Sequence, residues 1–110
     1  MSENKNNPFN YEQIDEMLSS RIRLTVLALL AGCEEAEFTY IRDMVGASDG
    51  NLASHLRKLE DADYVTLDKR FLGRKPATFY RITTAGQSAL LDYSRHLAEL
   101  LSHTQKGGTP

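Results

Sequence analysis

The chain has 110 residues, 41% of them hydrophobic and 25% charged, with a formal net charge of −2 and one cysteine. This length suits a single domain with a modest core, and one cysteine excludes an internal disulfide. No apolar run approaches the roughly 18 residues of a membrane span, and no signal-like segment opens the chain, so we expect a soluble, cytoplasmic protein. Cys33 follows an apolar run and is expected to pack rather than to react.

The charges are unevenly distributed along the chain. Residues 1–50 contain four basic and nine acidic residues, whereas residues 51–110 contain nine basic and six acidic ones. The stretch 69–81 contains five basic residues and no acidic one. Because a phosphate charge acts mainly within a Debye length of about 8 Å, this local excess matters more than the negative total.

The first third of the chain predicts an arm and two helices. Residues 1–9 are polar and are expected to form a flexible arm. Apolar residues recur at helical spacing from about residue 10 to 18, which predicts a first helix. Ser20 is placed to cap a second helix, which is apolar on nearly all sides and so belongs at the centre of the domain. Gly32 suits the end of that helix, and the acidic residues after it are expected to form a solvated loop.

A pair of short helices follows. Phe38 is expected to add a short strand, and Thr39 to cap a third helix that Gly46 stops. The apolar stripe of that helix consists of Ile41, Met44 and Val45. Only two residues separate this helix from Ser48, which is placed to cap the next one. Two short helices joined by so tight a turn are typical of a helix-turn-helix, although a generic helix pair has the same spacing.

The fourth helix, from Ser48 to about Ala62, is two-faced. Its apolar side is made by Leu52, Leu56 and Leu59. Its polar side carries Asn51, Ser54 and Lys58, flanked by His55 and Arg57. These side chains can reach base edges and phosphates, so a helix held down by leucines with this face outward suits a DNA major groove.

A basic hairpin and a long helix complete the domain. Alternating residues predict strands at 64–71 and 78–83, joined by a turn at 72–77. Lysines also occur at hairpin edges to prevent aggregation, but the position directly after the two-faced helix favours a DNA-binding wing. Thr83 is expected to cap a last helix that runs to residue 101. Its seam, made by Leu90, Tyr93, Leu97 and Leu100, suits pairing with a second subunit, with packing onto its own domain as the alternative.

In this order of elements, the chain resembles the winged-helix transcriptional regulators of the MarR/ArsR type, from about residue 11 to 101. The segments that carry the resemblance are Ser20-Arg21-Ile22-Arg23-Leu24, Ser48-Asp49-Gly50-Asn51-Leu52, His55-Leu56-Arg57-Lys58-Leu59-Glu60, Arg74-Lys75-Pro76 and Thr78-Phe79-Tyr80-Arg81-Ile82-Thr83-Thr84-Ala85-Gly86. The expected fold class is mainly α with a small β-hairpin: a winged helix-turn-helix, residues 10–101, with a long C-terminal dimerisation helix and a disordered tail, 102–110.

The resemblance implies a homodimeric repressor on a near-palindromic double-stranded DNA operator, with half-sites about 34–36 Å apart. The residues assigned to DNA are Ser48, Asn51, Ser54, His55, Arg57, Lys58, Lys69, Arg70, Arg74 and Lys75. Among them, Asn51 and Ser54 are expected at base edges, and Arg74 and Lys75 at the wing tip. The dimer interface is assigned to Ile14, Met17 and Leu18 of the first helix and to the seam of the last. A small-molecule effector that binds between the DNA module and the dimer helices is possible in such a protein.

Other functions receive less support from the sequence. Asp92, His96 and His103 depart from the metal-ligand spacing of ArsR-type relatives, so neither a metal nor another cofactor is expected. The chain has no phosphate-binding glycine loop and no nucleophile motif, so we expect no enzyme. The main alternative is a winged-helix adaptor that binds a protein instead of DNA, which the acidic first half would suit. RNA binding is disfavoured because Phe71, Phe79 and Tyr80 are needed in the hairpin core.

Overall fold

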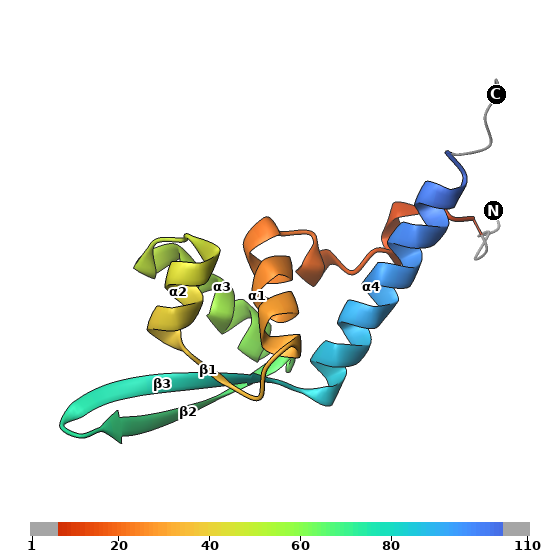
Figure 1. Cartoon of the computed structure of the whole chain (residues 1–110). Helices are drawn as coiled ribbons and strands as arrows, with labels where there is room; N and C mark the ends of the chain where they lie inside the picture. Colours follow the sequence, from red (N-terminus) through yellow and green to blue (C-terminus); the bar gives the residue numbers. More distant parts are fainter. Residues whose placement is uncertain (1–6, 105–110) are drawn as a thin grey trace.

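The computed structural model describes residues 7–104, so most of the predicted arm and tail lie outside the described residues. Along the chain (Figure 1), the elements are two 3₁₀ turns, η1 (Tyr11–Gln13) and η2 (Glu16–Leu18), followed by α1 (Arg21–Ala31), β1 (Ala36–Glu37), α2 (Phe38–Val45), α3 (Asp49–Asp61), β2 (Val65–Leu72), β3 (Lys75–Ile82) and α4 (Thr84–Ser102). This is the expected winged helix fold with a long last helix. Within the described residues, no helix is both long and apolar enough to cross a membrane.

The predicted first helix is wrong, since two separate 3₁₀ turns take its place. The Asn10 side chain accepts a hydrogen bond from the Glu12 amide, and the Asp15 side chain accepts one from the Met17 amide. Such local bonds compete with the helical ladder and restart the chain at each site. Ile14, between the two turns, has extended backbone.

Helix α1 lies at the centre of the domain, as predicted. Ser20 caps it by accepting from the Arg23 amide, and it ends at Gly32. It contacts α2, α3, α4 and β3, and its residues Val26, Leu27 and Leu30 are fully buried. Cys33, just beyond its end, is exposed, which contradicts the expectation that it packs.

Helices α2 and α3 form the helix-turn-helix. Gly46 ends α2 in the left-handed region at φ 80°, where a side chain would be strained, and Ser48 caps α3 as predicted. The start of α2 differs from the prediction. The short strand is Ala36–Glu37 rather than Phe38, and α2 begins at Phe38 without a side-chain cap, so Thr39 is a helical residue. An ion pair of 3.0 Å between Arg42 and Asp49 joins the two helices across their turn.

The wing is the long antiparallel hairpin formed by β2 and β3. The short strand β1 pairs with the other edge of β3, which gives a three-stranded sheet of order β1-β3-β2. The hairpin extends away from the helices (Figure 1). The predicted six-residue turn is wrong, because Leu72 pairs with Lys75 and only Gly73 and Arg74 connect the strands. Gly73 has φ 67° and Arg74 does not have a positive φ, which is the pattern of a two-residue type II′ turn.

Tyr64 joins the N-terminal segment, the base of the wing and α4. Its hydroxyl donates to the Asp15 carboxylate, and this hydrogen bond raises the pKa of Tyr64 to about 12. Its carbonyl accepts from the amide of Thr83, the cap of α4, at 3.0 Å. Gly86 of α4 lies so close that an added Cβ would be 2.3 Å from the same carbonyl oxygen.

Candidate nucleic-acid interface

Helix α3 separates its two faces as the sequence predicts. The three leucines of the apolar side are at most 1% exposed and belong to the core. The polar side chains of the other face are exposed, with His55 alone half-buried: Asn51, Ser54, Arg57 and Lys58. The packed leucines therefore hold α3 in place on the core, and the opposite face of the helix presents a continuous polar surface.

Ser48 and His55, which are assigned to DNA, also have roles inside the protein. The Ser48 hydroxyl accepts from the Asn51 amide, so it is occupied as a helix cap. The His55 Nδ1 lies 3.0 Å from a guanidinium nitrogen of Arg23. Because a guanidinium can only donate, Nδ1 accepts, and the neutral ring carries its proton on Nε2. Burial and the charges of Arg23 and Lys58 lower the pKa of His55, which favours this neutral form.

Five of the basic residues assigned to DNA form no ion pair within residues 7–104, and all are exposed: Arg57, Lys58, Lys69, Arg74 and Lys75. Two lie on α3 and three on the wing. Their charges are therefore available to phosphates.

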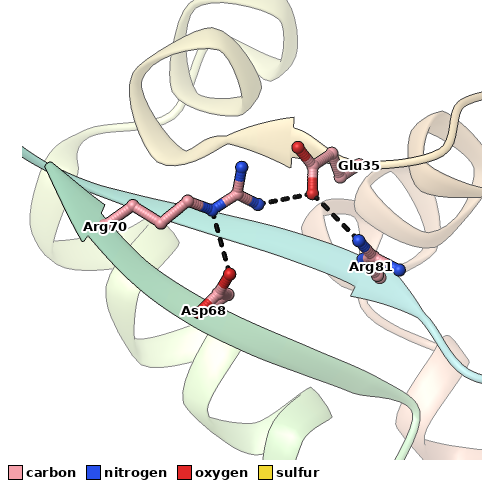
Figure 2. Close-up of polar contacts among 4 residues, drawn as sticks. All are labelled: Glu35, Asp68, Arg70 and Arg81. Carbon is pink, nitrogen blue, oxygen red and sulfur yellow. Dashed lines mark hydrogen bonds and ion pairs between the residues drawn. The ribbon is translucent and has the colours of Figure 1, made fainter. Parts of the chain in front are cut away.

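Arg70 differs from the other basic residues of the wing, because it is engaged inside the protein (Figure 2). Its guanidinium binds the carboxylates of Glu35 and Asp68 and lies 3.9 Å above the centre of the Phe79 ring. Arg81 also binds Glu35, at 3.3 Å. Glu35 is thus not part of a solvated acidic loop, as the sequence suggested, but ties the loop before β1 to both wing strands. The predicted DNA contact of Arg70 would require it to leave these partners.

We expect the stabilising effect of Glu35 to depend on pH. The Arg70 guanidinium holds the Glu35 pKa below 4.5. The pairing therefore stabilises the fold above that value and is lost as the pH falls through the lowered pKa. Glu35→Gln should accordingly be less stable than the wild type near pH 7, and the difference measured by urea unfolding should shrink as the pH falls through the lowered Glu35 pKa. Glu34→Gln, which removes a neighbouring exposed carboxylate, should show neither effect.

A groove of about 660 Å³ separates α3 from the wing. Arg57 lies on its helical side, while Lys69 and Thr78 lie on its strand side. Glu60 and Asp61 line it too, so the groove changes from basic to acidic along its length. Phosphates would be favoured only beside Arg57 and Lys69.

The second candidate surface lies between α1 and α4. An apolar groove of about 510 Å³ is lined by Leu24, Leu90, Tyr93, Leu97 and Leu101, among others. Leu97 is 41% exposed and Leu101 50%, although both are large apolar side chains. Of the α4 seam assigned to the dimer interface, Leu97 thus remains uncovered in one chain, whereas Leu90 and Tyr93 are half-buried against the chain's own core.

The assignment of Leu18 to the dimer interface is wrong. Its side chain is fully buried in the core of its own chain and has no surface to offer a partner. Ile14 and Met17, from the same segment, are half-buried.

Two further side chains differ from their predicted positions. Met44, expected in the apolar stripe of α2, is 61% exposed, while Ile41 of that stripe is fully buried. Phe71, expected in the hairpin core, is 72% exposed.

The histidines and acids of α4 do not gather into a metal-binding group. Among residues 7–104, no three His, Cys, Asp or Glu side chains lie close enough together to hold a metal ion. Asp92 instead pairs with Arg95 on the same helix.

Comparison with known proteins agrees with this geometry. Residues 22–101 match the winged helix DNA-binding domain family. The uncharacterized protein MJ0432 of Methanocaldococcus jannaschii is 34% identical over 85 residues, which cover 77% of this chain and 92% of that protein. A transcriptional regulator homologue from Pyrococcus horikoshii has a similar structure, with a TM-score of 0.72 and 27% identity over 86% of this chain and 98% of that one. A MarR-family regulator from Silicibacter pomeroyi, 16% identical with a TM-score of 0.64, shares the fold over 91% of this chain and 66% of its own.

Proposed function

The chain belongs to the winged helix DNA-binding domain family and is a DNA-binding transcriptional regulator, and we propose that it acts as a homodimeric repressor. The observation that carries this proposal is the combination of α3 and the wing. Both present exposed cations that form no ion pair among residues 7–104, and α3 also carries the exposed Asn51 and Ser54. We infer that α3 enters a major groove and that the wing follows the adjacent backbone.

The proposed roles differ along this surface. Asn51 and Ser54 would contact base edges, because an asparagine amide can pair with adenine through two hydrogen bonds. Arg57, Lys58 and Lys69 would hold phosphates. His55 would add a donor through Nε2, since its other ring nitrogen accepts from Arg23. Ser48 contributes chiefly by capping α3, and Arg70 by fixing the wing.

The proposed dimer uses the apolar groove between α1 and α4. A second copy would cover Leu97 and Leu101 and would place two α3 helices on one side of the assembly. Such a symmetric pair suits a near-palindromic operator with half-sites about one helical turn, 34–36 Å, apart.

Repression is the simplest action of such a dimer, because a bound dimer excludes polymerase from a promoter. An effector that shifts α4 against the DNA module would change the spacing of the α3 helices. We assign the protein no enzymatic activity, and we place it in the cytoplasm on the grounds of its DNA-binding role.

The test of DNA binding is fluorescence anisotropy with a labelled duplex of arbitrary sequence, from low to physiological salt. We expect micromolar binding that weakens steeply with salt. The double variant Arg74→Ala/Lys75→Ala should bind every duplex more weakly, and the salt slope should fall by about two units per bound protomer.

The control for this experiment is Arg95→Ala, which removes a basic residue from α4, away from the wing, and should leave the slope unchanged. Absence of binding by the wild type at low salt would contradict the proposal. That result would favour the adaptor function, for which a pull-down of protein partners is the next experiment.

A further inference from the structure

The end of the wing carries two large apolar side chains that contact no core. Phe71 is 72% exposed and Leu72 is 52% exposed. They lie immediately before the turn, at the end of the hairpin that extends away from the helices (Figure 1). An exposed apolar hairpin end promotes aggregation, and proteins commonly place charges or proline there instead. The wing of this protein has charged side chains and Pro76 near its turn, and it also retains Phe71 and Leu72 there.

The strand register places Phe71 on the side of the wing that faces α3. Side chains alternate along a strand, so Phe71 shares a face with Leu67 and Lys69, both of which line the groove beside α3. Its cross-strand partner on the same face is Pro76. Phe71 and Pro76 thus extend, past the end of the groove, the surface that we propose follows DNA.

The opposite face of the wing carries charged side chains that are paired within the protein. Asp68 and Arg70 lie on that face, where Arg70 binds Glu35 (Figure 2). This pairing ties the stem of the hairpin to the body of the domain. The rest of the domain therefore fixes the position of the hairpin whose end carries Phe71 and Leu72.

The charges around Phe71 indicate the kind of partner. Lys69, Arg74 and Lys75 are exposed and unpaired within the described chain, and no acidic residue occurs between 69 and 81. The complementary surface must be polyanionic and must also offer an apolar recess. The minor groove of double-stranded DNA meets both conditions, because phosphates line its edges and sugar carbons its walls, and proteins insert apolar side chains between its base steps.

We propose that Phe71 is a minor-groove contact that makes the wing sensitive to DNA sequence, in addition to the phosphate contacts of Arg74 and Lys75. This inference rests on the proposed DNA-binding function. Readout in the minor groove depends mainly on the guanine 2-amino group, which projects into it. Phe71 therefore favours base pairs that lack this group.

The experiment uses two labelled duplexes of one sequence, with guanine in the first and inosine in the second. Inosine lacks the 2-amino group but keeps the major-groove face of guanine. The wild type should bind the inosine duplex several-fold more tightly. Phe71→Ala should weaken that binding about tenfold, the effect of losing the burial of part of an aromatic ring, and should remove the preference. Its salt slope should equal that of the wild type, because no phosphate contact is lost.

Three further variants test whether the preference for inosine depends on the apolar side chain at position 71. Phe71→Leu should recover part of the preference because it restores apolar volume. Tyr11→Ala removes an aromatic side chain that is 78% exposed in the N-terminal segment, and should have no effect. Arg74→Ala should lower the salt slope by about one unit and leave the inosine preference in place.

The outcomes separate the two proposals. If the wild type binds with a steep salt dependence but Phe71→Ala matches it on both duplexes, the Phe71 contact is refuted and the DNA-binding function stands. If the wild type binds neither duplex at low salt, the proposed function itself fails. If Phe71→Ala instead changes the sedimentation coefficient of the free protein, the wing end is a self-association surface, and the proposal is overturned.

Discussion

Replacing Gly86 with alanine is expected to lower the free energy of unfolding by about 3 kcal/mol, the upper part of the range for overpacked sites. The added Cβ would lie 2.3 Å from the Tyr64 carbonyl oxygen and 2.8 Å from a side-chain carbon of Ile82. The first contact is with backbone, which cannot rotate away. Helix α4 must therefore move off the base of the wing, and the hydrogen bond from Thr83 to Tyr64 is strained with it. Urea unfolding of the two proteins measures the difference.

Gly50→Ala is the matched control for this prediction. Gly50 lies in α3 with open space around the position of a Cβ. The same substitution there should raise stability by about 0.5–1 kcal/mol, because alanine loses less conformational freedom in a helix. Equal stability of Gly86→Ala and the wild type would show that α4 does not pack so closely on the base of the wing.

Leu97→Glu is expected to convert the proposed dimer into a monomer and to weaken DNA binding about 100-fold or more. Leu97 lies in the apolar groove between α1 and α4, and a carboxylate there would lose its hydration on pairing. A monomer binds one half-site without the effective concentration that the second half-site provides. Analytical ultracentrifugation measures the first effect, and anisotropy with a two-half-site duplex the second.

The control for Leu97→Glu is Thr84→Glu, which adds the same charge at an exposed position in the first turn of α4, outside the groove. It should remain dimeric. A Leu97→Glu protein that still sediments as the wild-type dimer would place the interface elsewhere on the surface.

The sequence was sufficient to predict the elements whose limits are set by local chemistry. Ser20, Ser48 and Thr83 each cap the helix that was expected to follow them, because a hydroxyl oxygen before a periodic apolar run satisfies free amides. The three leucines of α3 are buried for the same kind of reason, since their spacing defines one helical face.

The errors occur where a local signal competed with another interaction. Residues 10–18 have helical spacing, but the side chains of Asn10 and Asp15 bond to nearby amides and break the segment into two turns. The hairpin turn was predicted too long because Pro76 suggested irregular backbone, whereas it lies within β3 near the wing end.

The part of the candidate site that the sequence could not predict depends on contacts between distant residues. Glu35 and Arg70 are 35 positions apart, and only the sheet brings them together. Alternation along β2 correctly placed Phe71 on one face with Val65 and Leu67, but it could not show that the core ends before residue 71. The extent of the helical layer, which no strand pattern encodes, decides that Val65 is buried and Phe71 exposed.

Tyr64 gives the domain a property that concerns coupling rather than stability alone. The Tyr64 carbonyl accepts a hydrogen bond from the amide of Thr83, the residue that caps α4, and the Tyr64 hydroxyl donates to Asp15 of the N-terminal segment. Tyr64 also directly precedes β2, the first strand of the wing. A rotation of α4 about this joint would therefore tilt the wing. Because coupling between two binding events is reciprocal, subunit pairing that favours one wing angle would strengthen DNA binding at that angle, and DNA would strengthen pairing equally. Tyr64, at the base of the hairpin, would then be the residue through which subunit pairing and DNA binding are coupled.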